Sequence, residues 1–366
     1  MTALSSWLLR AGEHANPMLV RRVRQELRNR ASLGTILLVL LVAVIAAAVA
    51  AASDSDHAGR GLFAAVASAW SAMICLQANA ASRAIAGDRG AAAWDLIELT
   101  GMAPLRIVVG VVQSSLVLGL LGAAALAPFL VMAYLLRGLD LPSVIFAILT
   151  QPMAGALLGA FAAMTACIGA NRQARQGVGL ILALGLLLGW ISLSSLWASS
   201  EDGLARWMAD LLDGDDGAVI GLLAMLNAWA AALALALVLG ATLLTHRALD
   251  RSSLPRLVWC LIWLNGLLWL AGLIAWVWID KGWARVSGDL DEVLAVCATI
   301  GVAWALLLGL FAVSEDVELT ARQQESVRAG GRWRRAAMHL LGPGAARGAR
   351  CTLALLAGSL ALCAPW

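Results

Sequence analysis

Long apolar stretches separated by short polar segments dominate the chain. Each stretch holds about 20 residues or more, which is enough to cross the ~30 Å hydrocarbon core of a bilayer as a helix at ~1.5 Å per residue. Runs this long and unbroken exclude the short alternating strands of a membrane barrel. We therefore predict an all-α polytopic transmembrane helix bundle. The stretches are Leu33–Ala52, Leu62–Ala81, Ile107–Leu136, Val144–Ala170, Val178–Ala198, Val219–Leu244, Leu257–Ile279 and Val293–Val313.

A ninth apolar stretch near the end of the sequence is shorter than the others. Thr352–Ala364 covers 13 residues, so it is either part of a ninth span or a segment lying in the membrane interface. The prediction is a bundle of about eight or nine spans. Because 61% of residues are hydrophobic and only 13% are charged, no room is left for a large soluble domain.

The basic residues predict the orientation of the bundle. With the N-terminus in the cytoplasm, 21 of the 26 Lys and Arg residues fall in the inner segments and five in the outer loops. The positive-inside rule then predicts a multi-pass protein of the cytoplasmic (inner) membrane whose N-terminus is cytoplasmic. We expect no nucleic-acid partner.

The segment before the first span predicts an interfacial helix. Asn16 is a good N-cap and Pro17 suits the first helical position. Leu19, Val23 and Leu27 recur every four residues, which predicts an apolar stripe in the acyl boundary. The arginines would then reach anionic headgroups; they are Arg21, Arg22, Arg24 and Arg28. The alternative interpretation is a basic flank that only directs membrane insertion.

A second amphipathic helix is predicted outside the membrane, over residues 201–213 between the fifth and sixth spans. Its apolar positions follow helical spacing and include Leu204, Trp207, Met208 and Leu211. The segment is too short to cross, so it should lie at the outer leaflet.

The cytoplasmic loop 82–106 is the strongest candidate for function. Most of it should be helical, with Asp88 and Asp95 seven residues apart on one face and Trp94 turned away. A partly apolar helix on the cytoplasmic surface calls for a partner, either lipid or protein. The simpler interpretation is a solvated connector.

This loop resembles the first cytoplasmic loop of ABC-2 type transporter permeases. The match consists of an acidic, glycine-containing start, an acidic-Leu-x-x-Leu-Thr stretch, a Pro-Leu pair and a glycine in the first turns of the third span. In this chain they are Asp88-Arg89-Gly90, Trp94-Asp95-Leu96-Ile97-Glu98-Leu99-Thr100, Pro104-Leu105 and Gly110. The sequence departs from the family pattern at Gly101 and Val111. The interfacial helix before the first span, called the elbow helix below, also matches the family layout. So does the outer helix between the fifth and sixth spans.

The resemblance implies the membrane subunit of an ATP-driven transporter, working in export. The helix over 84–101 would be the coupling helix that enters a cleft of a separate ATPase subunit, and a second permease chain, identical or similar, would complete the complex near the first and fifth spans. The coupling candidates are Asp88, Arg89, Trp94, Asp95, Glu98 and Thr100. The sequence has no G-x-x-x-x-G-K-[ST] motif, so ATP and Mg²⁺ would bind to the partner, and we expect no cofactor or enzymatic activity in this chain.

The predicted organisation has four parts. Residues 1–32 form the cytoplasmic N-terminus with its elbow helix, and 33–247 form a six-span permease core. Residues 248–313 add two spans, and 314–366 hold a basic segment and the last apolar stretch. These additions keep a second hypothesis open, namely a non-transporting membrane scaffold of a multiprotein complex. A secondary transporter and an intramembrane enzyme are disfavoured, because no ionisable cluster lies in a span.

Overall fold

The computed structural model shows an all-helical chain, with no strand among the residues it describes. Seven of the described helices are long and apolar enough to cross a membrane. The chain separates into two compact units, residues 1–243 and 244–366. The described residues are 16–53, 57–90, 97, 99–136, 139–168, 172–199, 203–245, 252–281, 294, 296–309, 325, 340–342 and 344–361.

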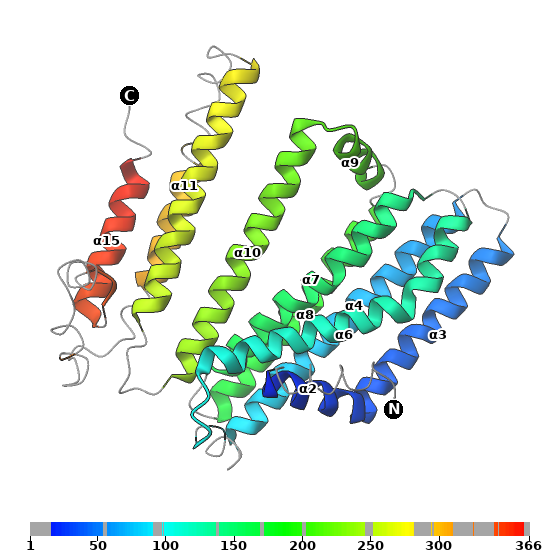
Figure 1. Ribbon diagram of the computed structural model, residues 1–366, viewed down its shortest axis with the longest axis horizontal. Coiled ribbons are helices and arrows are strands. Elements are labelled where there is room, and N and C mark those ends of the chain that lie inside the picture. The colour runs from blue at the N-terminus through cyan, green and yellow to red at the C-terminus, as the bar shows by residue number, and fades with distance from the viewer. Residues whose placement is uncertain are drawn as a thin grey trace, which may run out of the picture. The chain divides into compact units, whose positions relative to one another are not determined.

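The first unit holds the elbow helix, six long helices and one short outer helix (Figure 1). Each predicted span in this unit is present as a helix, and the helices that cover the second and fifth spans extend a turn or more past the apolar stretch. The helix of the fourth span ends at Ala166, short of the predicted end at Ala170. The helices are α2 (Pro17–Arg28), α3 (Arg30–Ala52), α4 (Ala58–Gly90), α6 (Pro104–Leu135), α7 (Leu141–Ala166), α8 (Arg172–Ser199), α9 (Gly203–Leu212) and α10 (Asp216–Leu244).

Local sequence signals place the helix ends. The Asn29 side chain accepts a hydrogen bond from the Ala31 amide at 3.1 Å and starts α3 immediately after α2 ends. Asp140 does the same for α7 through the Ser143 amide at 3.0 Å. These side chains satisfy backbone donors that the first helical turn leaves unpaired.

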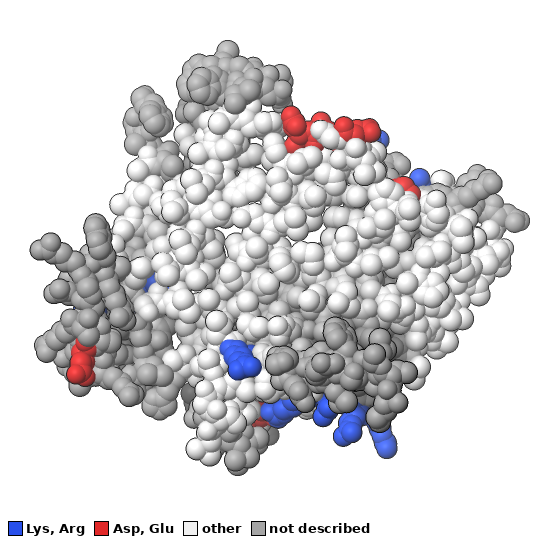
Figure 2. All heavy atoms as spheres, in the orientation of Figure 1, with Lys and Arg blue, Asp and Glu red and all other residues white. Residues whose placement is uncertain are grey.

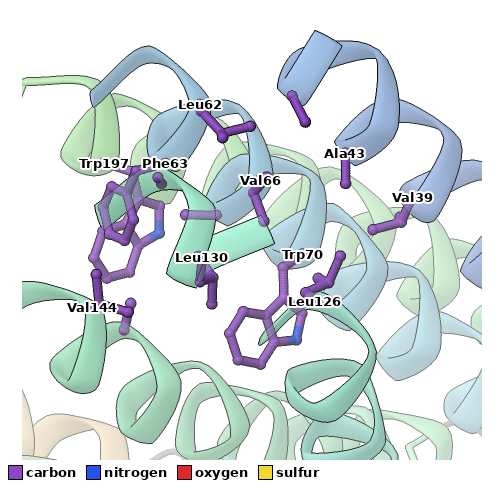
Figure 3. Packing of buried hydrophobic residues seen from close by; sticks show 14 of the residues in the cluster. Val39, Ala43, Leu62, Phe63, Val66, Trp70, Leu126, Leu130, Val144 and Trp197 are labelled. Carbon is purple, nitrogen blue, oxygen red and sulfur yellow. The ribbon is translucent and has the colours of Figure 1, made fainter. Parts of the chain in front are cut away.

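Helix α4 is the centre of the core, because it contacts α3, α6, α7 and α8. Trp70 of α4 is fully buried, and Figure 3 shows it beside Leu126 of α6. Its ring lies against Gly122 of α6, where an added Cβ would be 3.0 Å from the indole Nε1. The small residue on α6 therefore makes the space that the largest side chain of α4 fills.

Small residues also set the contact between α6 and α7. A Cβ added at Gly119 would lie 3.1 Å from the Pro152 Cα, and one at Gly159 would overlap the Ser115 side chain. Gly155 and Gly159 of α7 are spaced as G-x-x-x-G, a pattern that allows close approach of membrane helices. The second such pair, Gly185 and Gly189 of α8, meets nothing within 4 Å in this chain.

One buried amide joins two helices of the core. Gln151 of α7 is 2% exposed, and its Nε2 donates to the Ser71 Oγ of α4 at 2.8 Å. A polar group in a bundle interior is stabilised when it finds such a partner. Gln151 is thus a packing contact of the core.

The second unit contains α11 (Ser253–Lys281), an apolar helix over Val296–Gly309, and α15 (Ala345–Ala361). The Trp259 and Trp304 rings stack with centroids 4.3 Å apart, and each indole N–H donates to the other residue's carbonyl, at 3.1 and 3.3 Å. These contacts join α11 to Val296–Gly309. The predicted eighth span, Val293–Val313, is described only over part of its length.

Contacts along α15 show that it runs in the same direction as α11. Arg256 near the start of α11 donates to the carbonyls of Gly342 and Gly344, just before α15 begins. Further along both helices, the Trp263 indole donates to the Ser359 Oγ at 3.2 Å. Of the two interpretations of the last apolar stretch, a helix rising alongside α11 fits these contacts better than a segment lying flat in the interface. Its last residues, 362–364, lie outside the described residues.

The charge distribution predicts which exposed residues face the cytoplasm. In a chain whose six native cysteines are replaced, Asp213→Cys should react on intact cells with an impermeant maleimide. Arg83→Cys should react only after permeabilisation, because the positive-inside rule places it in the cytoplasm. Both side chains are exposed in the structure, so burial does not explain a difference. The reverse pattern of labelling would overturn the orientation.

The close approach of α6 and α7 predicts a stability effect. Gly159→Val should destabilise the protein by about 1–3 kcal/mol, because the new side chain would overlap Ser115 in a packed interface. Gly61→Val is the matched control, since a Cβ at Gly61 of α4 meets nothing within 4 Å. Thermal unfolding of the two variants in detergent measures the difference. Equal melting temperatures for both variants would contradict the contact.

Candidate functional site

The candidate site lies at one end of the first unit, where α2 packs against α6 and makes side-chain hydrogen bonds to the C-terminal part of α4 (Figure 1). Asn16 is the N-cap of α2, and its Oδ1 accepts from the Met18 amide at 3.1 Å. Its Nδ2 donates to the Arg106 carbonyl of α6 at 2.6 Å. One side chain therefore both begins the elbow helix and fastens it to α6. The predicted roles of Asn16 and Pro17 in starting the helix agree with this geometry.

The packing of α2 against α6 depends on a glycine. Met18 is 6% exposed, and a Cβ added at Gly110 would lie 2.6 Å from the Met18 Cβ and 2.9 Å from the Asn16 Nδ2. Any larger residue would push the two helices apart. Gly110, which the sequence resemblance singled out, thus serves helix packing here.

The face of α2 that packs against the protein is not the apolar stripe predicted to lie in the acyl boundary. Met18, Arg22 and Glu26, spaced four residues apart, are buried, whereas Leu27 is 42% exposed. The prediction that Arg22 reaches lipid headgroups is wrong, because the residue is 2% exposed and its Nη2 donates to the Ala81 carbonyl of α4 at 2.7 Å. The remaining arginines predicted for that role, Arg21, Arg24 and Arg28, are exposed or partly exposed.

Arg22 is a charged group held inside the protein. Burial lowers the pKa of its guanidinium, and the negative charges of Glu26 and Asp88 counter that effect. Glu26 lies one helical turn away on the same face, at the spacing where opposite charges attract. Since an arginine stays charged in proteins, the junction of α2 and α4 holds a buried guanidinium with the buried Glu26 one turn away.

Asp88 and Arg89, two of the predicted coupling residues, lie in the last turn of α4. Asp88 Oδ1 is 2.9 Å from the Arg21 Nη2 of α2, an ion pair whose side chains are 21% and 41% exposed. Arg89 Nη1 donates at 2.6 Å to the carbonyl of Cys167, the C-cap residue of α7. A cation at a helix C-terminus is favourable, so Arg89 stabilises the ends of α4 and α7 together.

The turn that follows is only partly described. Trp94, Asp95 and Glu98 lie outside the described residues. Thr100 is exposed, and its Oγ1 donates to the Ile97 carbonyl at 2.6 Å. Gly101 has a φ of 65°, a conformation that suits glycine, and it ends this turn before Pro104 begins α6. Leu99 is 82% exposed.

The outer amphipathic helix is present at the opposite end of the unit. Helix α9 is followed by a turn at Gly214 (φ 78°), and the Asp215 carboxylate then accepts from the Ala218 amide at 3.0 Å. Met208 is buried, Leu211 is partly buried, and the Trp207 ring contacts Phe146 of α7 edge to face at 5.5 Å between centroids. The Leu204 side chain is not described.

Charged side chains divide between the two ends of the first unit. Figure 2 shows basic atoms along the edge where α2 lies and acidic atoms at the opposite edge over α9, with uncharged residues between them. The acidic edge includes Asp210, Asp213, Asp215 and Asp216. An uncharged belt between two charged ends is the surface that a bilayer requires. Among the described residues, no group of three or more His, Cys, Asp or Glu could hold a metal ion.

Sequence reasoning identified α2 and the end of α4 but missed the contacts between them. Arg21 and Asp88 are 67 residues apart in the sequence, and no local sequence pattern predicts their ion pair. The Arg22 and Glu26 spacing was the one available signal, since an oppositely charged pair one turn apart can be buried as a unit.

The contact of α2 with α4 predicts coupled substitutions. Arg21→Asp or Asp88→Arg alone should weaken docking of α2, because each places like charges 2.9 Å apart where an ion pair stood. The double variant Arg21→Asp with Asp88→Arg should recover most of the loss. Because both side chains are partly exposed, the coupling free energy in a double-mutant cycle should be about 0.2–1 kcal/mol. Additive single effects in thermal unfolding would show that the pair makes no energetic contact.

Comparison of the chain with protein-family models, with curated proteins and with solved structures finds no match.

Proposed function

We propose that this multi-pass membrane protein is the permease subunit of an ATP-driven transporter of the ABC-2 type, working in export. The observation that carries the proposal is the junction at the end of α4, where Asp88 pairs with Arg21 of the docked elbow helix and where, further along the chain, Leu99 is 82% exposed. ATP and Mg²⁺ are bound by a separate ATPase subunit.

The position of α4 suits the transmission of a movement. Its last turn holds Asp88 and Arg89, and the same unbroken helix carries Trp70 in the centre of the core. A displacement of the turn after α4 therefore acts on a rigid element that contacts four other helices. Rigid helices packed in this way move as units when a partner closes on one end.

The elbow helix adds further helices to the region that an ATPase subunit would move. Arg21 joins α2 to the last turn of α4, and Asn16 joins α2 to the first turn of α6. Arg89 adds the end of α7 through the Cys167 carbonyl. Four helices are thus connected by polar contacts at one end of the bundle, where a partner would contact them together.

Leu99 is the side chain that most clearly calls for a partner. It is 82% exposed on the turn between Ile97 and Gly101. The Thr100 amide and hydroxyl both donate to the Ile97 carbonyl, at 3.2 and 2.6 Å. A turn that presents one large apolar side chain suits insertion into a cleft of a partner protein.

A second permease chain is part of the proposal, since two ATPase subunits would need two coupling turns. The outward face of α8 is apolar and exposed, and Gly185 and Gly189 on that helix have open space beside them. Small residues allow two membrane helices to approach closely. The exposed apolar residues of this face include Leu180, Ile181, Leu184, Leu187, Leu188 and Ile191.

Substitution of Leu99 tests the proposal. When the tagged chain is purified from its own membrane, a P-loop ATPase should co-purify, and Leu99→Glu should reduce its affinity about 10- to 100-fold. That reduction corresponds to the ~1.5–3 kcal/mol gained by burying a leucine. Leu212→Glu on α9 is the matched control, because that leucine is 70% exposed at the opposite end of the unit.

The two variants give opposite results under the proposal. Leu212→Glu should retain the ATPase fully, and both proteins should insert normally because neither residue lies in a span. Retention of a P-loop ATPase by Leu99→Glu at the wild-type level would leave the turn a simple connector. Absence of any such ATPase from the wild-type preparation would favour the scaffold hypothesis.

A further inference from the structure

A pair of thiols lies in the second unit, between α11 and α15. The Sγ atoms of Cys260 on α11 and Cys351 on α15 are 3.4 Å apart, although 91 residues separate them in the sequence. A disulfide requires a Sγ–Sγ distance of about 2.05 Å, so the two atoms need to approach by roughly 1.4 Å. We propose that Cys260 and Cys351 form an oxidisable dithiol that closes to a disulfide and covalently links α15 to α11.

Contacts on both sides of the pair hold the two helices in register. On one side, the buried Arg256 guanidinium donates to the Gly342 and Gly344 carbonyls. On the other side, the Trp263 indole donates to the Ser359 Oγ at 3.2 Å. The hydrogen bonds of Arg256 and Trp263 therefore hold the two helices together on both sides of the thiol pair.

Close packing limits the directions in which the helices can separate. A Cβ added at Gly358 of α15 would lie 2.6 Å from the Cη2 atom of Trp263, which shows how tightly α15 lies on the α11 surface. The Cys351 side chain is 2% exposed, whereas Cys260 is partly exposed. A small reagent can thus reach the pair from the Cys260 side, and the buried partner is already in place to react.

The chemistry balances with a hydroperoxide as oxidant. The thiolate of one cysteine attacks a peroxide oxygen of H₂O₂, which breaks the O–O bond, forms a sulfenic acid and releases hydroxide. The second thiol then attacks the sulfenic sulfur; the S–S bond forms, the S–O bond breaks and water leaves. The two sulfurs together lose two electrons, and the peroxide is reduced by two.

The predicted topology explains when the bond would form. Cys260 is seven residues from the start of α11, on the side assigned to the cytoplasm by the positive-inside rule. Cytoplasmic thiols are normally kept reduced, so the pair would be a dithiol at rest and would close only when peroxide rises. The bond is a modification of this chain and does not depend on the proposed transport function.

Thiol counting in native membranes tests the inference. Membranes holding the full chain are treated with H₂O₂, free thiols are blocked with N-ethylmaleimide, and the denatured protein is then reduced and tagged with a polyethylene-glycol maleimide. Oxidised wild-type protein should gain two tags, whereas Cys260→Ser and Cys351→Ser should each lose the two-tag band. Cys297→Ser is the matched control on a neighbouring helix and should keep both tags.

Peptide mapping of the oxidised wild-type protein makes the test independent of any variant's folding. A linked peptide containing Cys260 and Cys351 within one chain is the expected product. No linked peptide after oxidation, a different cysteine pair, or a bond between two chains at these positions would each overturn the proposal. If Cys351→Ser does not insert into the membrane, Cys351→Ala should lose the two-tag band in its place.

Discussion

Packing between helices is the interaction on which the rest of this structure depends. In a bilayer the lipid tails are as apolar as leucine side chains, so burying an apolar surface between helices gains little by itself. Association then relies on complementary shape, and in the first unit glycines leave room for the neighbouring residue of another helix. Trp70 against Gly122, Pro152 against Gly119 and Ser115 against Gly159 are examples. They place α4, α6 and α7 close enough for the buried amide of Gln151 to find the Ser71 hydroxyl.

The candidate site follows from this packing, because it lies where the packed helices end. At this end of the unit, the helices are connected also by hydrogen bonds from polar side chains to backbone carbonyls. Arg22 binds the Ala81 carbonyl and Arg89 binds the Cys167 carbonyl, while Asn16 binds that of Arg106. Cys167 is the C-cap of α7, so Arg89 supplies a donor that this helix end lacks. The Ala81 and Arg106 carbonyls lie within α4 and in the first turn of α6, so those two contacts connect helices without ending them.

The second unit uses a different set of contacts for a similar purpose. Stacked indoles of Trp259 and Trp304 exchange hydrogen bonds with each other's backbone, and the buried Arg256 binds two carbonyls ahead of α15. These directional contacts hold α15 parallel to α11 and bring two cysteines within reach of each other. Trp259 and Trp304 thus contribute to helix packing in this unit.

Much of the fold could be predicted from the sequence, because lipid leaves the backbone few choices. A stretch of about 20 apolar residues must satisfy its own hydrogen bonds, so it becomes a helix whatever surrounds it. For the same local reason, Asn16 and Pro17 determine where α2 begins and the helical spacing around Trp207 predicts α9. Only the tertiary structure decided which face of α2 is buried, that Asp88 pairs with Arg21, and that Cys260 meets Cys351. Those outcomes depend on side chains 67 and 91 residues apart in the sequence, and only the packed arrangement of helices brings such residues together.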